Sequence, residues 1–163
     1  MVIRDARPDD AQAVAAIYAH HVLHGTASFE HEPPSVEFWR DKISGVVAKG
    51  WPFLLAEQDG EILGYAYATQ FRDRPAYAHT CENSIYVRHD RLGQGTGRQL
   101  LERLIQLARE AGFGQMIGVI GGAEPASVAL HRACGFHEAG RMRSVGFKFG
   151  QWLDTLYMQR PLA

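Results

Sequence analysis

Leu92-Gly93-Gln94-Gly95-Thr96-Gly97-Arg98 places alternating glycines between an apolar run at 80–87 and a helical pattern at 99–111. The run at 80–87 reads as a strand. The helical pattern has one apolar face, formed by Leu100, Leu101, Leu104, Ile105 and Ala108. Glycine lets the backbone approach a ligand closely, and the free amides at a helix N-terminus favour an anion. The segment therefore predicts a site for a phosphate-bearing ligand.

Three kinds of phosphate-binding loop share such glycines. A nucleotide-hydrolase loop would continue with Gly-Lys-Ser/Thr, whereas Gly97 is followed by Arg98 and Gln99. A dinucleotide fingerprint needs Gly-x-Gly-x-x-Gly early in a βαβ unit, but these glycines alternate and follow several strands. The pyrophosphate loop of an acyl-CoA-binding acetyltransferase, Gln/Arg-x-x-Gly-x-Gly/Ala, fits with Gly95 and Gly97 in its glycine places. A glycine-rich turn without a ligand is the remaining alternative.

Hydrophobic periodicity divides the rest of the chain into short strands and amphipathic helices. We expect strands at 2–4, 53–57, 61–69, 80–87, 116–120, 138–147 and 152–160. Helices are expected at about 8–23, from 33 onward, at 99–111 and from 125 or 126 to 134. In the second helix the predicted buried stripe is Phe38, Trp39 and Ile43. The order β-α-α-β-β-β-α-β-α-β-β indicates an α/β (α+β) fold with a mixed central sheet and helices on its faces.

Length and charge narrow the class of protein. A chain of 163 residues fits one domain, spanning 1–163. Because 17 Lys and Arg nearly balance 18 Asp and Glu, the net charge of −1 offers no field for nucleic acid or an anionic membrane. The two cysteines, Cys81 and Cys134, suit a reducing compartment. With no leader pattern and no membrane-length apolar run, we expect a cytoplasmic protein.

Histidines gather at His20, His21 and His24. Positions 20 and 24 share a helix face, which raises the possibility of a metal site. No acidic or cysteine partner stands at a recognisable ligand spacing. We therefore expect no metal.

Several further segments occur in a fixed order along the chain. They are Ile3-Arg4-Asp5-Ala6, Leu63-Gly64-Tyr65-Ala66, Glu82-Asn83-Ser84-Ile85-Tyr86-Val87, the glycine loop, Ala126-Ser127-Val128-Ala129-Leu130-His131 leading to Gly135-Phe136, and the run from Val145 to Asp154. With these segments the sequence resembles the GNAT acetyltransferase superfamily over nearly the whole chain. Within that superfamily it is similar to the phosphinothricin and methionine-sulfoximine N-acetyltransferases.

The resemblance implies a GNAT fold with a mostly antiparallel sheet, and transfer of an acetyl group from acetyl-CoA to a small amino-acid-like amine. It also implies a homodimer in which Lys148–Thr155 lies close to the partner's acceptor pocket. A GNAT enzyme for another small amine, such as a polyamine or an aminoglycoside, is one alternative. A non-catalytic CoA-binding module is another.

Residue roles follow from the same resemblance. Glu82 matches the base, and His131 matches a histidine that assists proton transfer. Acetyl-CoA is expected on the backbone of Ile85, Tyr86 and Val87 along its pantetheine arm, and its pyrophosphate on Gly93, Gln94, Gly95, Thr96, Gly97 and Arg98. The positions matching substrate contacts are Arg72, Asp73, Arg74, Glu82, Asn83 and Ser84. Phe29 and Tyr77 are further candidates for the wall of the acceptor pocket.

The chain departs from the family pattern twice. Leu92 stands where the loop has Gln or Arg, and Glu124 stands where the family has an Asn that bonds the CoA arm. A carboxylate beside an anionic cofactor predicts weaker CoA binding, although the site is retained.

Physical chemistry leaves alternatives open at several of these residues. Arg72 and Arg74 suit an acceptor with acidic or sulfoxo groups, because guanidinium pairs bidentately with such oxygens; two solvated loop arginines are the alternative. His131 among apolar neighbours is compatible with a packed, satisfied histidine. Strand alternation puts Glu82 and Cys81 on opposite faces, which argues against a cysteine-acyl intermediate and for direct transfer.

Overall fold

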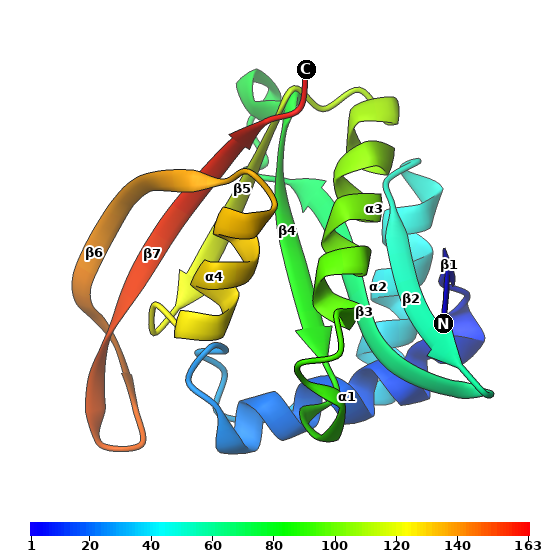
Figure 1. Cartoon of the computed structure of the whole chain (residues 1–163), viewed down its shortest axis with the longest axis horizontal. Coiled ribbons are helices and arrows are strands. Elements are labelled where there is room, and N and C mark those ends of the chain that lie inside the picture. The colour runs from blue at the N-terminus through cyan, green and yellow to red at the C-terminus, as the bar shows by residue number, and fades with distance from the viewer.

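The computed structural model describes residues 1–163 and contains one sheet of seven strands in the order β1-β2-β3-β4-β5-β7-β6. The element order matches the one expected from the sequence (Figure 1). The strands are β1 (Val2–Asp5), β2 (Phe53–Gln58), β3 (Glu61–Gln70), β4 (Thr80–Val87), β5 (Gln115–Gly121), β6 (His137–Lys148) and β7 (Gln151–Pro161). The helices are α1 (Ala11–His24), α2 (Val36–Ala48), α3 (Thr96–Glu110) and α4 (Pro125–Ala133). Short 3-10 turns lie at Pro8–Asp10, Pro75–Tyr77 and His89–Arg91.

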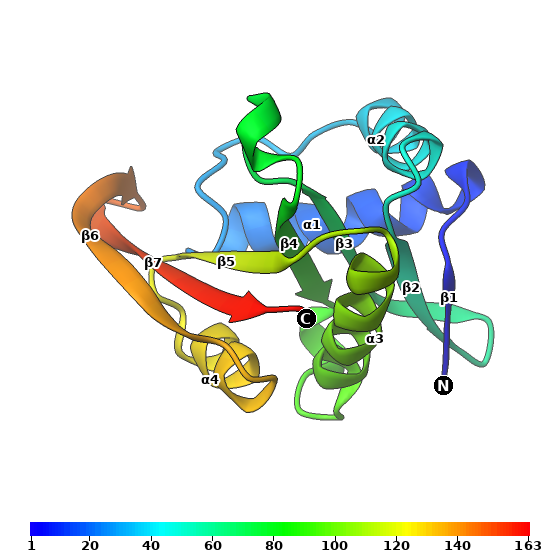
Figure 2. The same cartoon turned by 90° about the horizontal axis from the view of Figure 1, so that it is seen from above.

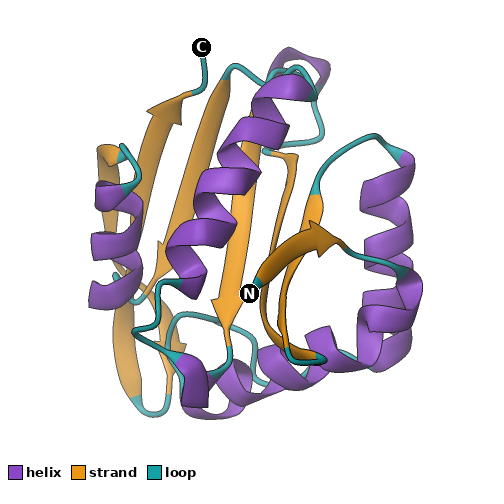
Figure 3. Ribbon diagram, turned by 45° about the vertical axis from the view of Figure 1, so that its right-hand side comes forward, coloured by secondary structure: helices purple, strands orange, loops and turns teal.

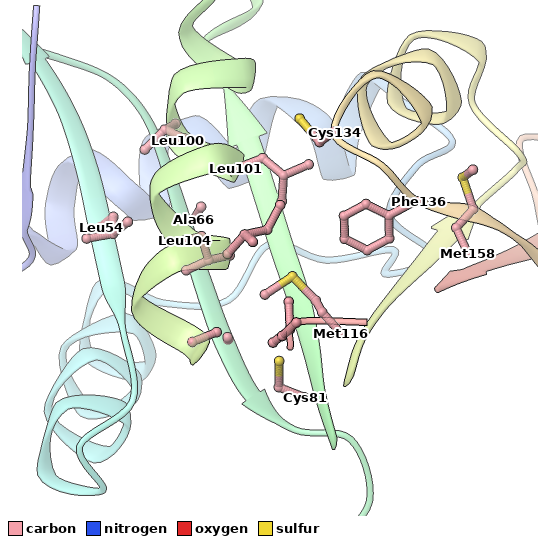
Figure 4. Packing of buried hydrophobic residues seen from close by; sticks show 14 of the residues in the cluster. Leu54, Ala66, Cys81, Leu100, Leu101, Leu104, Met116, Cys134, Phe136 and Met158 are labelled. Carbon is pink, nitrogen blue, oxygen red and sulfur yellow. The ribbon is translucent and has the colours of Figure 1, made fainter. Parts of the chain in front are cut away.

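Helices cover both faces of the sheet. Helices α1 and α2 lie on one face, and α3 and α4 on the other (Figures 2 and 3). Strand alternation divides the core accordingly, because successive side chains point to opposite faces. In β2, Leu54 and Ala56 join the cluster beneath α3, whereas Phe53 and Leu55 join the cluster beneath α1 and α2. Figure 4 shows the α3 cluster, in which Leu100, Leu101 and Leu104 pack on the sheet.

The buried stripe of α2 differs from the prediction at one position. Trp39 and Ile43 are buried, but Phe38 is 47% exposed. Adjacent residues on a helix lie about 100° apart, so Phe38 and Trp39 cannot both face the sheet. Val46, three residues after Ile43, takes the inward place instead. The rings of Phe38 and Trp39 form a T-shaped pair, with the centroids 5.4 Å apart.

One strand pair differs from the others. All neighbouring strands are antiparallel except β4 and β5, which run parallel. Their register covers only Thr80 to Asn83 opposite Gln115 to Gly118. Beyond Gly118, β5 continues alongside β7, and beyond Asn83, β4 continues alongside β3. The two strands therefore diverge toward their C-terminal ends (Figure 1).

The hairpin of β6 and β7 forms the far edge of the sheet and projects beyond it (Figures 1 and 2). None of the helices combines the length and the apolar composition that a membrane crossing requires.

Candidate active site

A cleft of about 740 Å³ opens where β4 and β5 diverge. Its walls come from both strands, from the glycine loop, from α4 and from the connection after α1. Most residues that the sequence predicts for catalysis and cofactor binding line it: Glu82, Asn83, Ser84, Ile85, Tyr86, Val87, Gly93, Gly95, Thr96, Gly97, Arg98, Glu124 and His131. Gln94 is exposed outside this lining.

One edge of β4 faces the cleft without a neighbouring strand. Residues Ser84 to Val87 pair with β3, but β5 pairs with none of them. Backbone amides and carbonyls at such an edge require partners, and an extended ligand with amide groups can supply them as a further strand would. The divergence thus prepares a binding edge for an amide-bearing chain.

The glycine loop closes one end of this cleft. Gly93 and Gly95 have φ angles of 75° and 80°, in the left-handed region that glycine adopts without strain. Gly95 is the N-cap of α3, so the amides of the first helical turn point toward the loop. A Cβ at Gly97 would lie 3.3 Å from the Leu130 side chain, so α3 and α4 approach closely here. This geometry fits an anionic group.

Glu124 has a structural use that sequence reasoning missed. It is the N-cap of α4, and its carboxylate accepts hydrogen bonds from the amides of Ala126 (3.1 Å) and Ser127 (2.8 Å). A carboxylate at a helix N-terminus is stabilised by those amides and by the helix dipole. The negative charge at the cleft wall is therefore partly compensated by the chain itself.

Glu82 lies at the point where β4 and β5 separate, with its side chain 32% exposed. Burial raises the pKa of Glu82, while the charges of Arg72 and then Lys42 act in the opposite direction. The nearest atoms of Arg72 and Glu82, Nη1 and Oε1, are 3.9 Å apart. Lys42, which the sequence did not single out, comes from α2, and its ammonium lies 5.4 Å from the centroid of the Tyr67 ring. The result is an accessible carboxylate that binds protons more tightly than an ordinary glutamate.

Cys81 lies on the opposite face of β4 from Glu82, as strand alternation predicts. It is fully buried in the cluster beneath α3. Burial raises the pKa of its thiol to about 12. A protonated, enclosed thiol is a poor nucleophile.

His131 is buried, and both ring nitrogens have partners. Nδ1 lies 2.7 Å from the carbonyl oxygen of Ser127, and Nε2 lies 3.2 Å from Oδ1 of the Asn83 side chain. Because a carbonyl only accepts, Nδ1 carries the proton and Nε2 is left as an acceptor. Burial lowers the pKa of His131, which favours this neutral form. The Asn83 Nδ2 has no other hydrogen-bond partner. When the Asn83 amide is turned so that Nδ2 faces Nε2, Nδ2 donates a hydrogen bond to Nε2.

Asn83 and Glu82 are adjacent in β4, so their side chains point to opposite faces of the sheet. His131, which contacts Asn83 from α4, is therefore on the other face from Glu82. A Cβ at Gly118 would lie 2.8 Å from the His131 ring, so β5 leaves room for the histidine. His131 thus orients Asn83 at the cleft.

Of the predicted acceptor residues, Glu82, Asn83 and Ser84 line the cleft, and the other five lie on exposed loops outside it. Arg72, Asp73, Arg74 and Tyr77 follow β3, and Phe29 follows α1. The Gln70 side chain, which the sequence did not single out, donates to the carbonyls of Arg72 (2.6 Å) and Arg74 (3.1 Å) and holds the arginine loop in shape. Arg72 is the member of this loop that approaches Glu82.

No group of three or more metal-ligating side chains comes together. His20 instead stacks on His89, with ring centroids 3.6 Å apart.

A splayed parallel strand pair with an amide edge and an anion-binding loop defines a cleft for a long ligand that carries both amides and phosphates. Residues 3–157 match the acetyltransferase (GNAT) domain. The chain belongs to the GNAT acetyltransferase family and is an acetyl-CoA-dependent N-acetyltransferase.

Several N-acetyltransferases of known name are similar to this chain over nearly its whole length. A phosphinothricin N-acetyltransferase from Alcaligenes faecalis is 51% identical over 161 residues, covering 98% of this chain and 82% of the relative. An L-methionine sulfoximine/L-methionine sulfone acetyltransferase from Pseudomonas paraeruginosa is 39% identical over 161 residues, which are 98% of this chain and 94% of the relative. The crystal structure of a phosphinothricin acetyltransferase from Sinorhizobium meliloti in complex with acetyl-CoA superposes with a TM-score of 0.97 at 45% identity, covering 99% and 88%.

Proposed function

We propose that this enzyme acetylates the amine of a small amino acid with an acidic or sulfoxo side chain, of the phosphinothricin or methionine sulfoximine/sulfone type. The names of the relatives support this acceptor class. The arginine loop supports it independently, because Arg72 stands 3.9 Å from Glu82, where an acceptor amine would be deprotonated. An amino acid with its amine at Glu82 would present its oxygens to Arg72 and Arg74.

Glu82 acts as the general base in this proposal. The acceptor arrives as an ammonium ion, which is not a nucleophile until it loses a proton. A carboxylate whose pKa is raised by burial is, in its ionised form, a stronger base than an exposed glutamate. It takes the ammonium proton directly or through one water. The neutral amine attacks the thioester carbonyl and the C–S bond breaks, so that coenzyme A leaves as a thiolate and takes up the proton that the newly bonded nitrogen loses.

Acetyl-CoA supplies the acetyl group, and the chain's own residues orient it. The cleft edge at Ser84 to Val87 is suited to the amides of the pantetheine arm. The amides from Gly93 to Arg98 are suited to the pyrophosphate. With both ends held, the thioester is directed toward the point where β4 and β5 separate, beside Glu82. The divergence of β4 and β5 is the observation on which this proposed mechanism depends.

An acceptor panel with detection of released thiol tests the proposal. L-Phosphinothricin, L-methionine sulfoximine and L-methionine sulfone are compared with spermidine and an aminoglycoside. We expect turnover of the acidic or sulfoxo amino acids at least about 10-fold above that of the polycations, because Arg72 and Arg74 repel positive charge. Turnover of the polycations and of none of the amino acids would contradict the proposed acceptor class and favour a polyamine or an aminoglycoside as acceptor. No turnover of any acceptor would favour a CoA-binding module.

We also propose a cytoplasmic homodimer formed through the β6–β7 hairpin. This hairpin carries large exposed apolar side chains, namely Met142, Val145, Phe147, Phe149 and Trp152. Large exposed apolar side chains gathered on one hairpin favour a protein partner. Trp152 is 68% exposed and lies 4.9 Å from Phe147 between ring centroids. The two free, buried cysteines are compatible with a reducing compartment.

Sedimentation measures the dimer directly. We expect the wild-type chain to sediment as a dimer, and Trp152→Glu to sediment as a monomer because it places a charge among the exposed apolar side chains of the hairpin. A wild-type monomer at micromolar concentration would contradict the dimer.

A further inference from the structure

Lys148, at the end of β6, is a buried charge that the mechanism above does not use. Its neighbours Phe147 and Phe149 are 53% and 54% exposed, yet Lys148 itself is only 2% exposed. Its ammonium donates a 2.6 Å hydrogen bond to the carbonyl oxygen of Ser28. Burial lowers the pKa of Lys148, opposed by the charge of Glu30. Burying an ammonium costs free energy unless its hydrogen bonds are replaced, so this position calls for an explanation.

The bonded carbonyl belongs to a short segment beside the cleft. We call residues 25–30, which follow α1, the acceptor loop. Gly25, Thr26 and Ala27 line the cleft, and Phe29 is the predicted acceptor-wall residue. Within the loop, the Ser28 hydroxyl lies 2.8 Å from the Tyr18 hydroxyl and accepts the amide of Glu30 at 3.2 Å. Tyr18 thus holds the loop from α1, and Lys148 holds it from the hairpin.

Two glycines show how closely the loop packs against the sheet. A Cβ at Gly146 would overlap the Phe29 ring, so β6 leaves a hollow that the ring fills. A Cβ at Gly121, the last residue of β5, would lie 2.5 Å from the Ala27 carbonyl oxygen. The loop is therefore seated between the end of β5 and the hairpin, and the Lys148 ammonium donates a hydrogen bond to its Ser28 carbonyl.

We infer that Lys148 is a positioning residue for the acceptor: through the Ser28 carbonyl it seats residues 25–30 against β5 and fixes Phe29 at the acceptor site. The inference rests on the proposed function, because it takes Phe29 as part of the acceptor wall. If Lys148 only stabilised the hairpin, its replacement would weaken the binding of acetyl-CoA and of the acceptor amino acid to a similar extent. A residue that positions the acceptor loop changes the acceptor KM more than it changes acetyl-CoA binding at the pyrophosphate loop.

The test compares Lys148→Met, which removes the ammonium at similar volume, with Lys148→Arg, which keeps a cationic donor. Lys49→Met is the matched control, because the Lys49 ammonium lies 4.8 Å from the centroid of the Trp51 ring, next to the end of α2. Each variant is assayed for acceptor KM, kcat and acetyl-CoA Kd. Hydrogen exchange of the amides of residues 26–30 is measured without acceptor.

For Lys148→Met we expect an acceptor KM raised about 10-fold and loop amides exchanging about 10-fold faster, because small displacements of positioning groups cost rate steeply. The acetyl-CoA Kd is expected to stay within about two-fold. Lys148→Arg recovers part of both losses, and Lys49→Met behaves as wild type. If Lys148→Met folds poorly, Lys148→Gln, a neutral donor, is judged by the same criteria.

Wild-type acceptor KM and loop exchange in Lys148→Met would overturn the inference, as would equal increases in acceptor KM and acetyl-CoA Kd. The exchange measurement separates this outcome from failure of the proposed function. If the wild type acetylates none of the proposed amino acids while Lys148→Met still loosens the loop, the acceptor class is wrong and the contact between Lys148 and the loop stands.

Discussion

Glu82→Gln is expected to lower kcat/KM for the acceptor by about 10²- to 10⁴-fold, the usual contribution of a positioned general base. Glutamine keeps the shape of the side chain but cannot accept the ammonium proton. Acetyl-CoA binding is expected to be unchanged, because the loop and the β4 edge do not depend on this carboxylate. Steady-state kinetics with the best acceptor of the panel, together with calorimetry of acetyl-CoA, measure both quantities.

The pH profile gives this variant a second readout. The deprotonated carboxylate is the active form, so wild-type kcat/KM falls as the pH drops through the pKa of Glu82. Burial raises that pKa, so the acid limb lies above the ordinary range of a glutamate. The limb is expected to vanish in Glu82→Gln. Glu138→Gln is the control, since Glu138 lies in β6 and pairs only at 3.8 Å with Arg132. Equal kcat/KM in wild type and Glu82→Gln would remove Glu82 from the mechanism.

Gly95→Val is expected to raise the acetyl-CoA Kd by at least about 10-fold, because a β-branched residue is strongly disfavoured at positive φ and the loop must change shape to accept it. The amides that favour the pyrophosphate then lose their common direction. Gly95 has a φ of 80°, and nothing lies within 4 Å of an added Cβ, so the effect is not a steric clash within the chain.

Gly60→Val is the matched control for this variant. Gly60, between β2 and β3, has a φ of 79° and equally open surroundings. It lies outside the lining of the cleft. Both variants are expected to lose similar stability in thermal unfolding, whereas only Gly95→Val weakens acetyl-CoA binding. Equal Kd values for the two variants would contradict the role of the loop.

Much of the fold could be predicted from periodicity. The apolar face of α3 and the alternation in β4 both appear in the structure, because these patterns follow from the geometry of one helix or one strand. Phe38 was misassigned because two adjacent aromatic residues leave the inward face of a helix ambiguous. The divergence of β4 and β5 could not be predicted, since each strand has an ordinary strand pattern and the separation arises only from their pairing.

Some residues of the candidate site could likewise be predicted from the sequence, and others could not. Segments proposed to bind through their backbone, such as the glycine loop and residues 84–87, have local sequence signals. Lys42, Gln70 and Lys148 were missed because their importance depends on distant partners. Lys148 stands between Phe147 and Phe149, and Ser28, the residue it bonds, is 120 positions away. Glu124 was expected to weaken the cofactor site, but capping of its own helix gives it another use.

The most direct test of the account is a crystal structure with coenzyme A and L-phosphinothricin bound together. We expect the pantetheine arm along Ser84 to Val87, the acceptor amine within hydrogen-bond or single-water reach of Glu82, and the acidic groups of the acceptor at Arg72 and Arg74. An acceptor amine held by other groups and separated from Glu82 by more than one water would contradict it.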